Sequence, residues 1–408
     1  MLALGLVHAA IGAAVAAGDA TVQASFVARA GSERLFLVLA CNAVLSPALA
    51  FAFARVVGRR GSRATIGAAC AFAILTSVGG LAVLGIADAR PGWAVAAYVA
   101  HEVASTIVTI HWGVFLLSHL GGSSAMRGVP AVYAASRAGA ALAGLAIGPL
   151  VGLAGTAAGL GLAGGCFAVA ALLALGTRRG ERTSLDSVPP GGSEEPRRAA
   201  VSAWRLMARS PLLRAIAVAT AAMILTRVLL RFQQQSVLES HGERSLAGML
   251  GLYTAAANAV GVALQLGLVG RLLARVGLTR ANLLYASATV LAQVALFFAA
   301  ALPAALGARF VDGELKDAIK TPLSSLFYEA FPRAERPEAR AAILGVVSPT
   351  ANLAGAAALA LLAGLSWPWA STAAGGAICA LFVLATVLQN RRYEAAIRRG
   401  SLGADQNA

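Results

Sequence analysis

The sequence has few charged and few aromatic residues. Only 12% of its 408 residues are Asp, Glu, Lys or Arg and 6% are Phe, Trp or Tyr, whereas 58% are hydrophobic. Soluble domains carry about 25% charged residues, so this composition excludes a soluble enzyme. A net charge of +15 would favour nucleic acid as a partner in a soluble protein, but here the arginines lie in short stretches between apolar runs. We therefore expect a lipid bilayer as the surroundings and no nucleic acid as a partner.

Cysteine and the common catalytic motifs are also scarce. The four cysteines all lie inside apolar runs without a CxxC pair, which is typical of small buried residues rather than of disulfides or metal ligands. The sequence contains no GxSxG, no HExxH and no phosphate loop ending in Gly-Lys-Ser or Gly-Lys-Thr. We expect no enzyme activity, no built-in ATPase, no metal site and no cofactor.

Apolar runs of about 20 residues, the length that crosses a bilayer, recur along the whole chain. They predict twelve transmembrane helices, which begin near residues 3, 35, 64, 92, 128, 156, 211, 246, 281, 303, 338 and 368. The first run lacks the basic segment that precedes the apolar part of a signal peptide, so we expect it to remain as a helix. The predicted fold class is an all-α membrane protein.

The arginines indicate how the chain is oriented. Of the 31 arginines, 23 lie in alternate loops and in the C-terminal tail, whereas the other loops hold only Arg29, Arg34, Arg90, Arg231 and Arg244. Arg and Lys near the ends of spans accumulate on the cytoplasmic side. We therefore expect a multi-pass protein of the inner (plasma) membrane with both termini in the cytoplasm.

One long polar segment divides the chain. Residues 177–203 are rich in Pro, Gly, Ser and charge, which is typical of a flexible linker. It separates a predicted N-terminal six-helix half, residues 1–176, from a C-terminal six-helix half, residues 204–390. Residues 391–408 are predicted to form a cytoplasmic tail.

The two halves repeat each other at two places. Arg55, Arg59 and Gly61 recur 216 positions later as Arg271, Arg275 and Gly277. Glu102, Thr109 and Phe115 recur 212 positions later as Glu314, Thr321 and Phe327. Two matches with nearly equal offsets indicate a duplicated six-helix unit, as in many transporters.

At these residues the chain resembles the major facilitator superfamily. Residues 58–63 (GRRGSR) look like a degenerate form of that superfamily's loop between helices two and three, although the usual acidic member is absent. The resemblance implies that this loop and its repeat gate access, and that spans one, four, seven and ten line a central cavity. The C-terminal half, with residues 309–316 (RFVDGELK) followed by Pro322, Arg336, Arg340 and Pro349, is similar to the ATP/ADP translocase-like branch.

Span ten carries an unusual set of charges. The only two lysines in the sequence, Lys316 and Lys320, both lie within it, where each charged group is expensive to insert. On an α-helical wheel of about 100° per residue they share one stripe with Arg309 and Asp312, so Asp312 and Lys316 are expected to pair. Glu314 and Asp317 border this stripe. It is either an anion-binding stripe in a water-filled cavity or a structural ion network that joins helices.

Further intramembrane charges lie on other spans. Glu102 lies near the middle of span four beside His101, and a carboxyl group at this depth suits a proton carrier; the alternative is a Glu paired with a cavity arginine. Asp19 of span one is expected to pair with Arg227 or Arg231 of span seven in one state of the cycle, although Arg231 also suits the membrane interface. Arg137 of span five is expected to face the cavity.

Together these patterns predict a secondary active transporter for a small anionic solute, monomeric and using alternating access. The expected solute ligands are Lys316, Lys320, Arg309, Arg137 and Arg227. The expected carriers of a proton or of coupled charge are Glu102, His101, Asp19, Asp312, Glu314 and Asp317. One alternative is a nucleotide exchanger of the ATP/ADP type. An alternative of another class is a non-transporting membrane scaffold that binds a partner.

Overall fold

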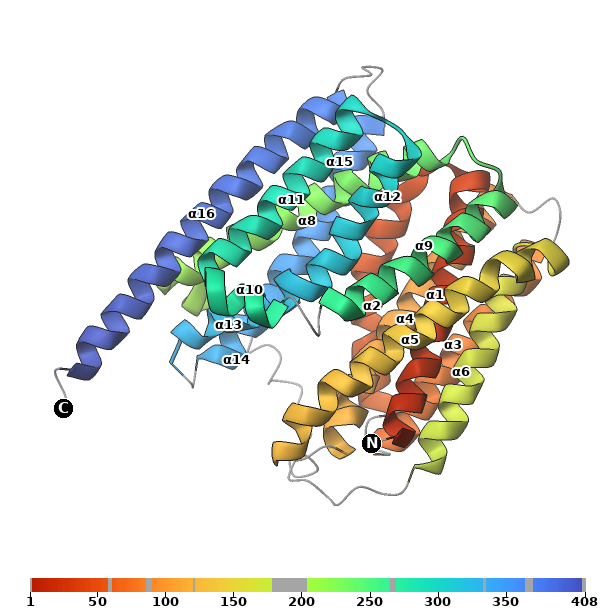
Figure 1. Ribbon diagram of the computed structural model, residues 1–408, viewed down its shortest axis with the longest axis horizontal. Helices are drawn as coiled ribbons and strands as arrows, with labels where there is room; N and C mark the ends of the chain where they lie inside the picture. Colours follow the sequence, from red (N-terminus) through yellow and green to blue (C-terminus); the bar gives the residue numbers. More distant parts are fainter. Residues whose placement is uncertain are drawn as a thin grey trace. The chain divides into compact units, whose positions relative to one another are not determined.

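The computed structural model describes residues 2–57, 61–85, 90–119, 122–177, 204–264, 269–332, 335–363 and 370–405, and nearly all of them are helical (Figure 1). Contacts between residues divide the chain into two compact units. The first contains Met1–Val188 and Leu238–Val262, and the second contains Pro189–Val237 and Ala263–Ala408. The predicted linker, apart from Thr177, lies outside the described residues. Each unit is therefore described by itself.

The first unit is built from seven described helices. In chain order they are α1 (Leu2–Ala30), α2 (Leu35–Val57), α3 (Ser62–Gly85), α4 (Pro91–His119), α5 (Gly122–Ala154), α6 (Ala158–Gly176) and α9 (Glu243–Ala263). The last of these follows the predicted linker in sequence, yet it groups with the N-terminal helices by its contacts.

The second unit contains longer helices that are interrupted by short ones. They are α8 (Pro211–Leu238), α10 (Val269–Val276), α11 (Leu278–Phe298), α12 (Leu302–Phe310), the π-helix η5 (Val311–Lys320), α13 (Thr321–Phe327), α14 (Arg336–Ala342), the π-helix η7 (Ile343–Val347), α15 (Ser348–Ala363) and α16 (Ala370–Asp405). The predicted cytoplasmic tail is helical as far as Asp405, because α16 continues through it.

The predicted class of fold, an all-α protein with many transmembrane helices, is confirmed. Eleven helices of the described residues are long and apolar enough to cross a membrane. The twelfth predicted span, near residue 303, is the segment α12–η5–α13, which is broken into three helices and carries several charges. Large apolar side chains such as Leu153 and Phe298 are 90% and 79% exposed, as expected for helices that face lipid.

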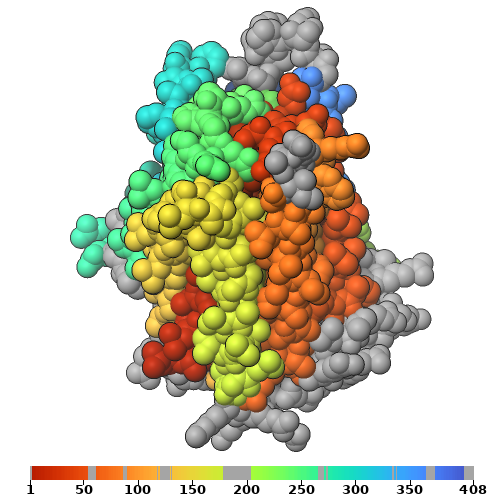
Figure 2. All heavy atoms as spheres, turned by 90° about the vertical axis from the view of Figure 1, so that its right-hand side faces the viewer, coloured from red at the N-terminus to blue at the C-terminus, as the bar shows by residue number. Residues whose placement is uncertain are grey.

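The core of the first unit forms around α1, which packs against α4, α5 and α6. Glycines allow this packing: a Cβ added to Gly12 would overlap the backbone of Ser136 on α5, and one added to Gly139 would overlap that of Ala9 on α1. The run 139–144 thus brings helix backbones together, as small residues do in membranes. On the outer face of this unit, α3 and α6 lie side by side (Figure 2).

Small residues also allow α9 to pack closely against α5. A Cβ at Gly144 would lie 2.5 Å from the carbonyl oxygen of Gly251, and one at Gly251 would lie 2.7 Å from that of Gly144. One turn away, Gly148 and Gly248 also face each other. The close approach of the two backbones explains why α9 groups with the N-terminal helices.

Apolar packing in the second unit surrounds the broken span ten. Ala318, Ile319 and Leu323 of this span pack with Tyr285 of α11 and Phe382 of α16. A second cluster joins the start of α8 to the end of α13, to α14 and to α16. A third cluster packs Ala305 and Ala308 of α12 against Leu230 of α8 and Leu296 of α11. The helices on both sides of η5 are therefore anchored, and this holds the π-helical turn in place.

The two copies of the predicted loop motif have the same local geometry. Gly61 and Gly277 both have left-handed backbones, with φ of 88° and 80°, and each directly precedes a helix, α3 or α11. Their carbonyl oxygens accept hydrogen bonds of 3.1 Å from the amides of Thr65 and Ala281. Glycine adopts this conformation without steric cost, which explains why both copies of the motif have glycine at this position.

The arginines of these loops are only partly described. Arg271 and Arg275 lie exposed on the short helix α10. Arg59 and the side chain of Arg55 lie outside the described part of the chain. The gating role of both loops stays a prediction.

Candidate functional site

Most of the charges of span ten lie in the π-helical segment η5. A π-helix forms hydrogen bonds from residue i to i+5, so its turn is wider than the α-helical turn. The wheel that placed Arg309, Asp312, Lys316 and Lys320 on one stripe therefore does not apply between residues 311 and 320. In the structure Asp312 and Lys320 are buried, Lys316 is partly exposed and Asp317 is exposed.

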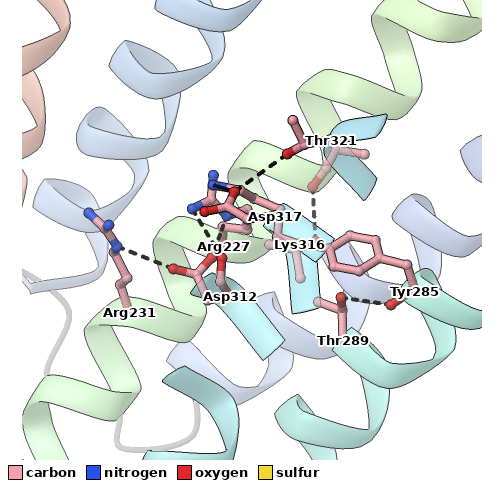
Figure 3. Close-up of polar contacts among 10 residues, drawn as sticks. Arg227, Arg231, Tyr285, Thr289, Asp312, Lys316, Asp317 and Thr321 are labelled. Carbon is pink, nitrogen blue, oxygen red and sulfur yellow. Dashed lines mark hydrogen bonds and ion pairs between the residues drawn. The ribbon is translucent and has the colours of Figure 1, made fainter. Parts of the chain in front are cut away.

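Asp312 lies at the centre of an ion cluster with two arginines of α8 (Figure 3). Arg227 donates a hydrogen bond from Nε to Oδ1 of Asp312, and Nε of Arg231 lies 3.4 Å from Oδ2. The two arginines are four residues apart and so occupy one face of α8. The expected pair between Asp312 and Lys316 is replaced by these contacts. The carboxylate of Asp312 is thus shared by two guanidinium groups.

Lys316 lies beside this cluster and pairs with its neighbour in sequence (Figure 3). Its Nζ is 3.2 Å from Oδ1 of Asp317, and the two side chains are 24% and 52% exposed. Lys316 is thus a partly exposed cation beside the two arginines that share Asp312.

Lys320 has different surroundings. It is only 4% exposed, and its Nζ donates a 2.7 Å hydrogen bond to Oδ1 of Asn282 on α11. Asn282 in turn donates to Asn390 of α16 at 2.9 Å, and Asn390 donates to the carbonyl oxygen of Thr279 at 2.7 Å. The two lysines therefore have different surroundings. Lys320 ties span ten to α11 and α16, and its role as a solute ligand stays a prediction.

Three further predicted residues are partly buried. Arg309 lies in the last turn of α12, Glu314 lies in η5, and Arg137 lies in α5 next to Ser136, whose backbone contacts Gly12 of α1. Their predicted roles as solute ligands or charge carriers stay predictions.

In the first unit the structure brings His101 and Asp19 together. Nε2 of His101 lies 3.1 Å from Oδ1 of Asp19 and 3.3 Å from Oγ of Ser105. The His101 ring is buried against α1, where a Cβ at Gly18 would overlap it. The side chain of Asp19 is 43% exposed. A buried imidazole is thus connected to an accessible carboxylate, which is an arrangement that can pass a proton.

Glu102 follows His101 in sequence but faces another helix. Nδ2 of Asn42 on α2 lies 3.4 Å from Oε2 of Glu102, and the side chain is half-buried. The residues of the predicted ion pair between Asp19 and Arg227 or Arg231 have other partners in this structure. Asp19 contacts His101, and both arginines contact Asp312. That pair stays a prediction for another state of the cycle.

Several polar residues of the described structure were missed by the sequence analysis. Arg29 of α1 was taken only as a marker of orientation, yet it binds Glu243 of α9 through two hydrogen bonds of 2.9 and 3.1 Å, and Ser25 donates to the same carboxylate at 2.7 Å. Asn282 and Asn390 were also missed. Both lie beside charged residues at the ends of apolar runs, Asn282 near Arg280 and Asn390 before Arg391, so the local sequence does not distinguish them.

Comparison with known proteins supports the fold alone. No protein-family model and no curated protein matches the sequence. Among solved structures, the nucleoside transporter NupG is similar with a TM-score of 0.65 and 12% identity, over 97% of this chain and 98% of that one. The xylose transporter XylE from E. coli, in an inward-open conformation, has a TM-score of 0.64 and 13% identity, over 94% of both chains.

A third similar structure is a bacterial homologue of the human lysosomal transporter Spinster. It has a TM-score of 0.60 and 16% identity, over 97% of this chain and 96% of that one. All three of these proteins are transporters. The chain therefore has the fold of the major facilitator transporters.

Proposed function

We propose that the protein is a secondary active transporter that moves a small anionic solute across the inner membrane by alternating access. The observation that carries this proposal is the group of Arg227, Arg231 and Asp312 within two predicted spans, where two guanidinium groups share one carboxylate. Charged side chains inside a membrane are costly and usually serve a pathway or a ligand. Guanidinium groups are strong donors to an anionic solute.

In this proposal the solute ligands are Arg227, Arg231 and Lys316. A guanidinium group can donate two parallel hydrogen bonds to a carboxylate or a phosphate. The distance from Nε of Arg231 to Oδ2 of Asp312 is long, at 3.4 Å, so an anionic solute can compete with Asp312 for Arg231. Lys316 adds a mobile positive charge. Arg309 and Arg137 are further candidate ligands, and Glu314 and Asp317 are candidate countercharges.

A thermal-shift screen of solutes against the purified protein tests this function. Purified protein is mixed with phosphorylated and carboxylated metabolites, and a ligand that binds only the folded state raises the melting temperature. We expect anions to raise it and neutral sugars and nucleosides to leave it unchanged. Labelled forms of the anions that bind are then expected to enter reconstituted vesicles. Stabilisation by neutral solutes, with none by any anion, would contradict the proposal.

Glu102 and the pair of His101 with Asp19 are proposed to couple transport to protons. Glu102 is half-buried with an amide neighbour, so its carboxyl group can be protonated in one state and ionised in another. We expect Glu102→Gln to reduce proton-driven accumulation in vesicles at least tenfold, because the amide cannot release a proton. Exchange of internal for external solute needs no net proton movement and is expected to continue. Loss of both activities would show that Glu102 is not a coupling residue.

Nucleotide exchange is the second candidate within transport. It is favoured by the resemblance of span ten to the ATP/ADP translocase-like branch and by three cations that gather beside Asp312, since nucleotides are polyanions. Exchange of labelled ATP for ADP in vesicles distinguishes it from proton-coupled uptake. A non-transporting scaffold is less favoured, because Lys316 and Asp317 remain accessible instead of being sealed against fixed partners. We further propose cytoplasmic termini, from the distribution of arginine, and a monomer.

A further inference from the structure

Three consecutive glutamines near the end of α8 have contrasting surroundings. Gln233 accepts a hydrogen bond from Nε2 of Gln293 on α11. Gln234 and Gln235 are 3% and 1% exposed, yet Nε2 of Gln234 and Oε1 of Gln235 have no hydrogen-bond partner within the described structure. One buried donor and one buried acceptor on consecutive residues are thus without a partner in the described structure.

These two glutamines belong to the face of α8 that carries the ion cluster. At 3.6 residues per turn, Arg227, Arg231, Gln234 and Gln235 fall within a stripe about 100° wide, whereas Gln233 points away from it. The glutamine outside the stripe has a protein partner, and the two on the stripe each have an unpartnered amide atom. The stripe therefore carries two arginines toward its N-terminal end and two amide side chains toward its C-terminal end.

Buried amide atoms without partners are costly, and folded proteins contain few of them. Each one calls for an explanation such as a bound water, an ion or a ligand. Next to two arginines that share one carboxylate, a single solute accounts for both features. Its acidic group would contact the arginines, and its neutral end would satisfy the amides.

We propose that Gln234 and Gln235 form a second subsite that binds a hydroxyl group of the transported anion. Nε2 of Gln234 donates to the hydroxyl oxygen, and Oε1 of Gln235 accepts its hydrogen. This inference rests on the proposed function and specifies the class of solute: a hydroxylated carboxylate or a phosphate ester of a polyol. The rise along α8 is about 6 Å from Arg231 to Gln235 and about 12 Å from Arg227 to Gln235, which suits a solute of a few carbons.

The chain offers a matched control for these residues. Gln389 of α16 is also 3% exposed, and its Oε1 also has no partner within the described structure. It precedes Asn390, which belongs to the hydrogen-bond network of Lys320 and Asn282. Gln389 is therefore not part of the stripe on α8. A glutamine-to-leucine change at 389 therefore has the same chemistry at a place where the proposal puts no solute.

The test compares pairs of acids that differ by one hydroxyl group. Malate against succinate, and 2-hydroxypropyl phosphate against propyl phosphate, are titrated into the purified wild-type protein and into Gln234→Leu, Gln235→Leu and Gln389→Leu. We expect the wild type to bind the hydroxylated member of at least one pair about tenfold more tightly, the ratio that one good hydrogen bond gives. Gln234→Leu and Gln235→Leu are expected to lose this preference but keep the affinity for the other member, while Gln389→Leu keeps both.

The outcomes separate the two proposals. If the wild type binds the anions without preferring a hydroxyl group, the subsite is overturned and anion transport stands. An equal loss of preference in Gln389→Leu would also overturn the subsite, because the effect would then be a general one of packing. If the wild type binds none of these anions, the solute class assigned here is overturned, and the wider screen of anions decides the proposed function. Retained affinity for the member without a hydroxyl group shows that a leucine variant is folded, and Gln234→Asn and Gln235→Asn replace any variant that is not.

Discussion

Asp312→Asn is expected to lower the melting temperature of the purified protein by several degrees and to abolish solute uptake. The change removes the one carboxylate that contacts both Arg227 and Arg231. Breaking a buried ion pair by removing one partner costs about 3 to 5 kcal/mol, because the other charge is left buried without compensation. Here two guanidinium groups lose their common partner and repel each other. Thermal unfolding in detergent measures the first effect, and uptake by vesicles measures the second.

Two further variants control this prediction. Asp317→Asn also removes a carboxylate from span ten, but its side chain is 52% exposed, so we expect a change of stability below about 1 kcal/mol. The double variant Asp312→Asn with Arg231→Gln returns the cluster to its original net charge and is expected to recover part of the lost stability. Equal melting temperatures for Asp312→Asn and Asp317→Asn would show that the cluster does not hold span ten to α8.

The positions of the helices could be predicted from sequence because burial in lipid acts on each apolar run separately. The predicted starts near residues 35, 92 and 211 lie within a residue of the starts of α2, α4 and α8. Glycines repeated at a fixed offset, Gly61 and Gly277, also proved to have the same backbone conformation. Such features depend on a few neighbouring residues, so the sequence contains them directly.

The arrangement of charges within span ten could not be predicted in the same way. The wheel assumed an α-helix, but residues 311–320 form a π-helix, and hydropathy does not distinguish the two. The partners of these charges could not be predicted either. Lys320 donates a hydrogen bond to Asn282, and Asn282 donates one to Asn390, which is 108 residues away in sequence. Contacts of this kind depend on how distant helices pack, which local periodicity does not record.

The two lysines of span ten are expected to respond in opposite ways to the same substitution. Lys316→Gln should reduce uptake at least tenfold and leave the melting temperature nearly unchanged, because Lys316 has only an exposed ion pair to lose. Lys320→Gln should instead destabilise the protein by about 1 to 3 kcal/mol, since the shorter side chain leaves the buried Oδ1 of Asn282 without its donor. Melting curves and uptake per folded molecule are measured for both variants.

This comparison decides which lysine meets the solute. The two positions lie four residues apart on one span and undergo the same chemical change, so each variant is the control of the other. For Lys320→Gln we expect the concentration of solute that gives half-maximal uptake to stay within about twofold of the wild type, because Nζ of Lys320 already donates to the amide oxygen of Asn282. If Lys320→Gln raises that concentration while Lys316→Gln does not, the roles are reversed. The solute would then reach the network of Asn282 and Asn390, and the cluster at Asp312 would be a structural tie between span ten and α8.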